Sequence, residues 1–144
     1  MMRKKQKNRR LVFISHCSED GWVAEQISKR IKSSGADIFL DESHIQAGDD
    51  FEEKILEHLN KSDEILALLT PWALKRPYLW AELGVAWGKG IPIIGVLHGL
   101  SAGNLGKKSE ATIFLKRRSL IEINEIEKYF SELKSRLKTI RCKR

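Results

Sequence analysis

Short apolar runs alternate with amphipathic segments along this chain, and this alternation constrains the fold more than any other feature. The first run is Leu-Val-Phe-Ile-Ser at residues 11–15. Near-continuous apolar runs are typical of strands buried on both faces, and parallel strands need crossover connections, which are usually helices. Five runs are predicted to be strands: 11–15, 37–40, 64–70, 92–97 and 120–123. The pattern predicts an α/β domain with a five-stranded parallel sheet and helices on both faces.

The segments between these runs carry apolar side chains at helical spacing. The first apolar stripe begins at Trp22 and continues through Ile27 and Ile31. Asp50 with Glu53, and Asn124 with Glu127, have the spacing of a capping box at a helix start. The stretch 99–115 is rich in Gly, Ser and Lys and gives no clear assignment. The spacing predicts four helices: 22–35, 51–59, 78–89 and 126–140.

The net charge of +7 is concentrated at the two ends of the chain. Residues 1–10 and 134–144 hold six basic side chains each and no acidic one, which leaves 14 basic against 19 acidic residues between them, a net charge of −5. An acidic body does not predict a nucleic-acid-binding face. We expect solvated ends, with contact to RNA or anionic lipid as the weaker alternative. The predicted division is a basic tail at 1–10 and one domain at 11–141.

The sequence lacks the motifs that several classes of protein require. No G-x-G-x-x-G or Walker sequence is present, which argues against a Rossmann dehydrogenase or a P-loop enzyme. Four histidines and two distant cysteines, Cys17 and Cys142, predict no metal site and no disulfide framework. The apolar runs are too short to cross a bilayer, and the basic start has no apolar segment after it. We expect a reduced, cytoplasmic protein without a membrane segment.

Glu82 is the most informative single residue. It is the only charged side chain between Arg76 and Lys89, in a predicted helix apolar enough to be largely buried. A buried carboxylate must be paired, hydrogen-bonded or directed into a cleft. A structural glutamate bound to a neighbouring group and a functional one are both consistent with this pattern. Tyr78 lies four residues earlier, on the same helical face.

The other candidates follow the predicted strands, where doubly wound sheets place their ligand crevice. Ser15 and His16 end the first strand, and Asp41 ends the second, where an Asx-type turn is the alternative interpretation. A helix start after the first strand would lower the thiol pKa of Cys17 and make it reactive, although an inert core cysteine is the more common case.

Three motifs together resemble those of bacterial Toll/interleukin-1 receptor (TIR) domains. The resemblance covers residues 11–98 most strongly, and it implies the flavodoxin-like TIR fold. The motifs are Val12-Phe13-Ile14-Ser15-His16 with Ser18-Glu19-Asp20; Ile38-Phe39-Leu40-Asp41-Glu42 with Ile45, Gly48 and Phe51; and Leu68-Leu69-Thr70-Pro71 with Trp80-Ala81-Glu82-Leu83, continued by Ile91-Pro92-Ile93-Ile94.

The resemblance implies one of two functions, an enzyme or a scaffold. Many bacterial TIR domains cleave NAD⁺ between nicotinamide and ribose, sometimes with cyclisation of the product, and others are scaffolds that only self-associate. In the enzymes the catalytic residue is a glutamate on the helix after the third strand, which corresponds to Glu82. Those enzymes commonly carry Trp at the position of Tyr78. The loop 41–49 corresponds to the family's BB loop, which gates the site and contributes to assembly.

NAD⁺ would be the substrate, so no cofactor or metal is implied. The nicotinamide of NAD⁺ is cationic and leaves as a neutral amide, so one carboxylate suffices where most glycosidases need two. Partners implied are other TIR domains and a sensor or effector protein. The alternatives are an interaction module, including a virulence factor that interferes with host TIR signalling, and an enzyme like the nucleoside deoxyribosyltransferases. With Glu82 as catalytic residue, the predicted substrate-binding residues are Ser15, His16, Asp41, Ile45, Gly48, Phe51 and Tyr78.

Overall fold

The computed structural model describes residues 9–40, 51–105, 115 and 120–142. The strands are β1 (Leu11–Ser15), β2 (Asp37–Leu40), β3 (Glu64–Leu69), β4 (Ile93–Leu97) and β5 (Leu120–Glu122). The α-helices are α2 (Gly21–Ser33), α3 (Phe51–Lys61), α4 (Pro77–Lys89), α5 (Ala102–Leu105) and α7 (Ile126–Cys142). The 3₁₀ turns are η1 (Ser18–Asp20), η2 (Ala73–Lys75) and η4 (Ile123–Glu125).

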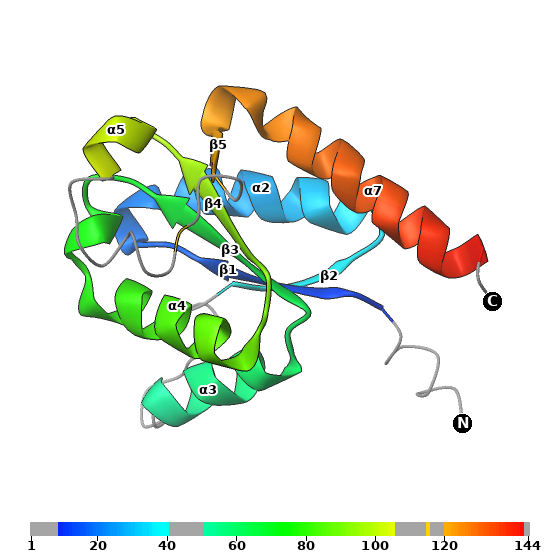
Figure 1. Ribbon diagram of the computed structural model, residues 1–144, viewed down its shortest axis with the longest axis horizontal. Helices are drawn as coiled ribbons and strands as arrows, with labels where there is room; N and C mark the ends of the chain where they lie inside the picture. Colours follow the sequence, from blue (N-terminus) through cyan, green and yellow to red (C-terminus); the bar gives the residue numbers. More distant parts are fainter. Residues whose placement is uncertain (1–8, 41–50, 106–114, 116–119, 143–144) are drawn as a thin grey trace.

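All five strands form one parallel sheet in the order β2-β1-β3-β4-β5. Helices α3 and α4 cover one face, and α2 and α7 cover the other (Figure 1). This architecture is the predicted flavodoxin-like one, and all five predicted strands are confirmed to within a residue at each end. The sheet order places β1 and β3 side by side at its centre, so the segments that follow these two strands meet at the carboxyl edge of the sheet.

The central strand β3 explains why continuous apolar runs mark this sheet. Ile65, Ala67 and Leu69 point into the core beneath α3 and α4, whereas Leu66 and Leu68 point into the core beneath α2 and α7. Every residue of the strand is buried. A strand with cores on both faces gains from apolar side chains at every position, so alternation disappears.

Two local expectations about helices are wrong. Trp22 does not join the buried stripe of α2, because its side chain is 74% exposed. Asn124 lies inside η4 and α7 begins at Ile126, so the predicted capping box with Glu127 does not form at that position. The Glu127 carboxylate instead accepts two hydrogen bonds of 2.5 Å from the Arg30 guanidinium of α2. This bidentate pair links α2 to α7. Asp50, from the other predicted box, lies outside the described residues.

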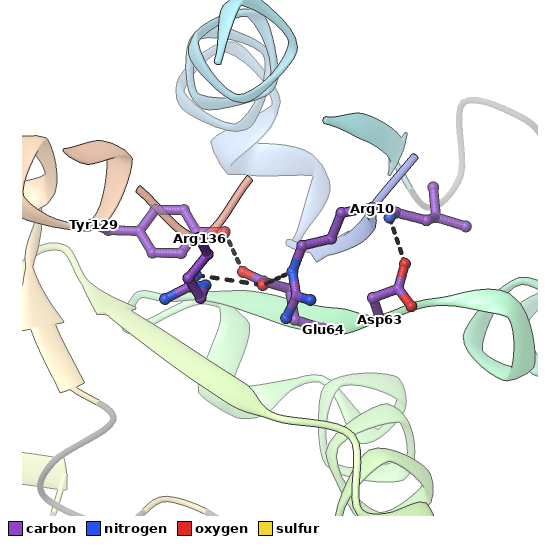
Figure 2. A network of polar contacts seen from close by, with 6 residues as sticks. Arg10, Asp63, Glu64, Tyr129 and Arg136 are labelled. Carbon is purple, nitrogen blue, oxygen red and sulfur yellow. Dashed lines mark hydrogen bonds and ion pairs between the residues drawn. The ribbon is translucent and has the colours of Figure 1, made fainter. Parts of the chain in front are cut away.

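The amino edge of the sheet holds a buried carboxylate that binds residues from both ends of the chain. Glu64 begins β3 and is fully buried. Its Oε1 accepts a hydrogen bond of 2.6 Å from Arg10 Nε and one of 3.4 Å from Arg136 Nη2, and its Oε2 accepts one from the Tyr129 hydroxyl (Figure 2). Burial and the nearby Glu64 carboxylate raise the pKa of Tyr129, so its hydroxyl stays protonated.

Arg10 belongs to this network, and Arg9 forms a separate ion pair at the same edge of the sheet. The Arg10 carbonyl accepts a hydrogen bond of 2.8 Å from Asp37 N, and Arg9 Nε lies 3.3 Å from Asp37 Oδ1. Residues 1–8 of the predicted tail lie outside the described residues. In the described part of the chain, no helix is both long and apolar enough to span a bilayer, and no cluster of side chains is suited to hold a metal ion.

Candidate functional site

Helix α4 carries Glu82 into the core at the carboxyl half of the sheet. The helix begins with Pro77, whose missing N–H is not needed in the first turn, and ends at Gly90, which has a φ of +73°. Its buried face consists of Leu79, Glu82, Leu83 and Ala86. Glu82 is only 2% exposed. The expected buried carboxylate is therefore present, and its surroundings decide what it can do.

Ser15, the last residue of β1, binds this carboxylate. The residue is 1% exposed, and its hydroxyl donates a hydrogen bond to Glu82 Oε1. Ser15 is fixed in turn by its register opposite Ala67 of β3. Two candidates that lie 67 residues apart in the sequence are thus in direct contact. The Ser15 hydroxyl donates this hydrogen bond and the Glu82 oxygen accepts it, so the bond fixes the position of the carboxylate at the carboxyl edge.

A second polar cluster lies beside this pair and was not predicted. Asp20 of η1 is 6% exposed, and its Oδ2 accepts a hydrogen bond of 2.6 Å from the Thr70 hydroxyl and one of 2.8 Å from Cys17 Sγ. Thr70 Oγ1 accepts a hydrogen bond of 3.1 Å from Ala73 N. These bonds join the segment after β1 to the segment after β3. The signal available in the sequence was that Asp20 and Thr70 both follow central strands.

This second cluster also determines the chemistry of Cys17. The side chain is fully buried, and burial together with the Asp20 carboxylate raises the pKa of the thiol to about 11. The alternative in which a helix start lowers this pKa is therefore wrong. A neutral, buried thiol is a poor nucleophile, so Cys17 has a packing role.

We expect Cys17 to resist alkylation in the folded protein. In a Cys142→Ser background, iodoacetamide at pH 8 should modify Cys17 at least about tenfold more slowly in buffer than in denaturant, because the nucleophilic thiolate is scarce and covered. Mass spectrometry of timed samples measures both rates. Equal rates in the folded and the unfolded chain would contradict the buried, protonated thiol.

Of the remaining predicted site residues, the structure describes the side chains of His16 and Tyr78. His16 follows Ser15 directly and is partly buried, and Tyr78 in the first turn of α4 is 41% exposed. Phe51 begins α3, but its side chain lies outside the described residues, as do Asp41, Ile45 and Gly48. The structure therefore brings together Ser15 and Glu82, flanked by His16. It places Tyr78 on the same helix as Glu82 with a much more exposed side chain.

The family of the chain follows from its sequence match. A family model described as the TIR domain matches residues 12–133, which is most of the chain and includes Ser15, Asp20, Thr70 and Glu82. The chain belongs to the TIR domain family. No curated protein matches this TIR domain in sequence.

Solved structures share the fold of this TIR domain at low sequence identity. The TIR domain of the Toll-related receptor TRR-2 from Hydra magnipapillata is 17% identical, with a TM-score of 0.65 over 90% of this chain and 97% of that one. A TIR-STING receptor from C. gigas is 14% identical, with a TM-score of 0.61 over 86% of this chain but only 38% of that one. A CMP N-glycosidase from Clostridium botulinum is 17% identical, with a TM-score of 0.60 over 86% and 98%.

Proposed function

We propose that this TIR domain is an NAD⁺ glycohydrolase that cleaves the bond between nicotinamide and ribose, with Glu82 as the catalytic residue. The observation that carries the proposal is the buried Glu82 carboxylate, oriented by the Ser15 hydroxyl at the carboxyl edge of the sheet. Membership of the TIR family adds support, because that family includes enzymes of this kind. A role in cytoplasmic defence or signalling belongs to the same proposal.

The chemistry needs little beyond a well-placed negative charge. The pyridinium ring leaves C1′ with the bonding electron pair as neutral nicotinamide, so no general acid has to protonate it. Positive charge then develops on the ribose ring, and a preorganised carboxylate stabilises that charge. Water attacks C1′ and loses a proton to give ADP-ribose. An adenine nitrogen of the same molecule attacking C1′ would give a cyclic product instead.

The other residues keep the substrate-binding roles that the sequence predicts for them. In this proposal Ser15 orients one carboxylate oxygen, and the ribose hydroxyls of NAD⁺ donate hydrogen bonds to the carboxylate. We assign His16 to contact with ribose or phosphate. The exposed ring of Tyr78 offers an apolar wall for a base. The proposal extends this substrate-binding role to four residues outside the described side chains: Asp41, Ile45, Gly48 and Phe51.

A substrate panel tests this function against its alternatives. The purified chain is incubated separately with NAD⁺, with CMP, and with a deoxynucleoside plus a free acceptor base, and the products are separated chromatographically. Release of nicotinamide from NAD⁺ alone supports the proposal. Release of cytosine from CMP, or transfer of deoxyribose, without NAD⁺ cleavage would contradict it and assign another N-glycosidic substrate. No turnover of any substrate at any protein concentration would favour the interaction module.

Self-association is expected to raise the activity. TIR domains generally self-associate, and Ile45 is an apolar residue in the otherwise polar predicted BB loop, suited to a small interface anchor. Turnover per molecule should therefore increase with protein concentration in the wild type and in Leu56→Asp, a matched change at an apolar residue of α3 that is 44% exposed. Ile45→Asp should remove the increase. Constant specific activity in all three proteins would contradict an assembly-dependent site.

A further inference from the structure

Thr70 joins the two segments that frame the Glu82 carboxylate. It directly follows β3 and is fully buried. Its hydroxyl donates a hydrogen bond of 2.6 Å to Asp20 Oδ2 and accepts one of 3.1 Å from Ala73 N. A single hydroxyl therefore binds η1, which follows β1, on one side and η2, which leads into α4, on the other.

A second set of contacts connects η2 to the helix that carries Glu82. The Trp80 indole Nε1 donates a hydrogen bond of 2.9 Å to the carbonyl of Leu74, which lies in η2. Arg76 N donates one of 3.0 Å to the carbonyl of Ala73, so the short connection into α4 is bound as well. Trp80 lies two residues before Glu82 in one continuous helix. Because a helix is a rigid element, a contact that holds Trp80 also constrains the place of Glu82.

Asp20 completes the connection on the side of β1. Only the short segment 16–19 separates it from Ser15, and this segment is bound internally. The Asp20 N–H donates a hydrogen bond of 3.0 Å to the Cys17 carbonyl, and Asp20 Oδ2 accepts one of 2.8 Å from Cys17 Sγ. The contacts form a closed ring that runs from Ser15 through Asp20, Thr70, Ala73, Leu74 and Trp80 to Glu82, which binds Ser15 again.

We propose that Thr70 is a positioning residue for the reaction, because its hydroxyl holds α4 at the place where the Glu82 carboxylate meets Ser15. The inference rests on the proposed catalytic role of Glu82, since Thr70 acts on the reaction only through that carboxylate. A displacement of about 1 Å in an active site is enough to cost a large part of the rate. A fully buried hydroxyl with a partner on each side prevents such a displacement.

The first test compares Thr70→Val, which removes the hydroxyl and keeps a side chain of similar size, with the conservative variant Thr70→Ser. We expect Thr70→Val to lower kcat for NAD⁺ at least about tenfold with little change in KM, because the carboxylate is displaced while the substrate contacts remain. Thr70→Ser keeps the hydroxyl and should recover most of the loss. Trp80→Phe, which removes the indole N–H bound to Leu74 and keeps an aromatic ring, should also lower kcat.

Tyr129→Phe is the matched control for the loss of this hydroxyl. It also removes a hydroxyl that donates to a buried carboxylate, but that carboxylate is Glu64 at the opposite edge of the sheet. Both variants should lower the melting temperature, whereas kcat per folded molecule should fall only in Thr70→Val. Nicotinamide release is measured at equal concentrations of folded protein. A wild-type kcat in folded Thr70→Val, or an equal fall of kcat in Tyr129→Phe, would overturn the positioning role.

A stability measurement separates this inference from the proposed enzyme. We expect the losses in unfolding free energy of Thr70→Val and Ser15→Ala to be non-additive, because the two hydroxyls belong to one ring of contacts. The losses of Tyr129→Phe and Ser15→Ala, at opposite edges of the sheet, should add. Non-additive losses in a chain that does not cleave NAD⁺ would contradict the proposed function and leave the positioning of Glu82 by Thr70 standing. Additive losses in both pairs would overturn the positioning role whatever the activity.

Discussion

Arg10→Ala lowers the free energy of unfolding by about 3 kcal/mol, the expected result of removing the nearest cation from a buried carboxylate. The Glu64 side chain is 1% exposed, and Arg10 Nε lies 2.6 Å from it. Arg136 is 0.8 Å farther away and its side chain is 42% exposed, so it replaces the lost partner only in part. The corresponding fall in melting temperature is about 10 °C for a domain of this size.

Arg9 provides the matched control for this prediction. It is adjacent in sequence and has the same side chain, but its ion pair with Asp37 is about half exposed on both sides. Exposed pairs contribute at most about 1 kcal/mol, so Arg9→Ala should shift the melting temperature by only a few degrees. Circular dichroism melts of the two variants and the wild type measure the difference. Similar melting temperatures for Arg9→Ala and Arg10→Ala would contradict the structural role assigned to the Glu64 network.

The fold could be predicted because each strand and helix is indicated by residues within its own segment of the sequence. Every residue of β3 is buried, so the strand is visible as an apolar run, and Gly90 marks the end of α4 at a position with positive φ. Contacts between distant segments were not predictable from such signals. The Arg30–Glu127 pair spans 97 residues and takes the place of a local capping box, and Arg10 reaches a carboxylate 54 residues away. No pattern near Glu64 in the sequence indicates that its carboxylate is buried and binds side chains from both ends of the chain.

The same distinction applies to the candidate site. Glu82 could be found from the sequence because it is the one charge in an apolar helix, and the rule that ligands bind at strand ends pointed to Ser15. That Ser15 touches Glu82, and Thr70 touches Asp20, depends on β1 and β3 being neighbours in the sheet. Strand order is a long-range property, so these pairings required the structure.

Glu82→Gln should reduce NAD⁺ cleavage by about 10²–10³-fold while the domain stays folded. Glutamine has nearly the same shape, and its amide oxygen can still accept the Ser15 hydrogen bond, so packing at this 2% exposed position is preserved. What is lost is the negative charge next to the developing positive ribose. Removing one preorganised electrostatic group from an active site typically costs about 2.7–4 kcal/mol of transition-state stabilisation.

A second buried carboxylate serves as the control for this change. Glu64 lies at the opposite edge of the same sheet, so Glu64→Gln also neutralises a buried charge but leaves the carboxyl edge intact. Its turnover per folded molecule should equal that of the wild type, although its melting temperature falls. Ser15→Ala should lose about tenfold in kcat, because the carboxylate loses the group that orients it.

The most direct measurement is the rate of nicotinamide release from NAD⁺ by wild type, Glu82→Gln and Glu64→Gln, quantified chromatographically at the same concentration of folded protein. The account predicts release by the wild type and by Glu64→Gln at similar rates and at least about a hundredfold slower release by Glu82→Gln. Release by a folded Glu82→Gln protein at the wild-type rate would contradict the assignment of this carboxylate as the catalytic group.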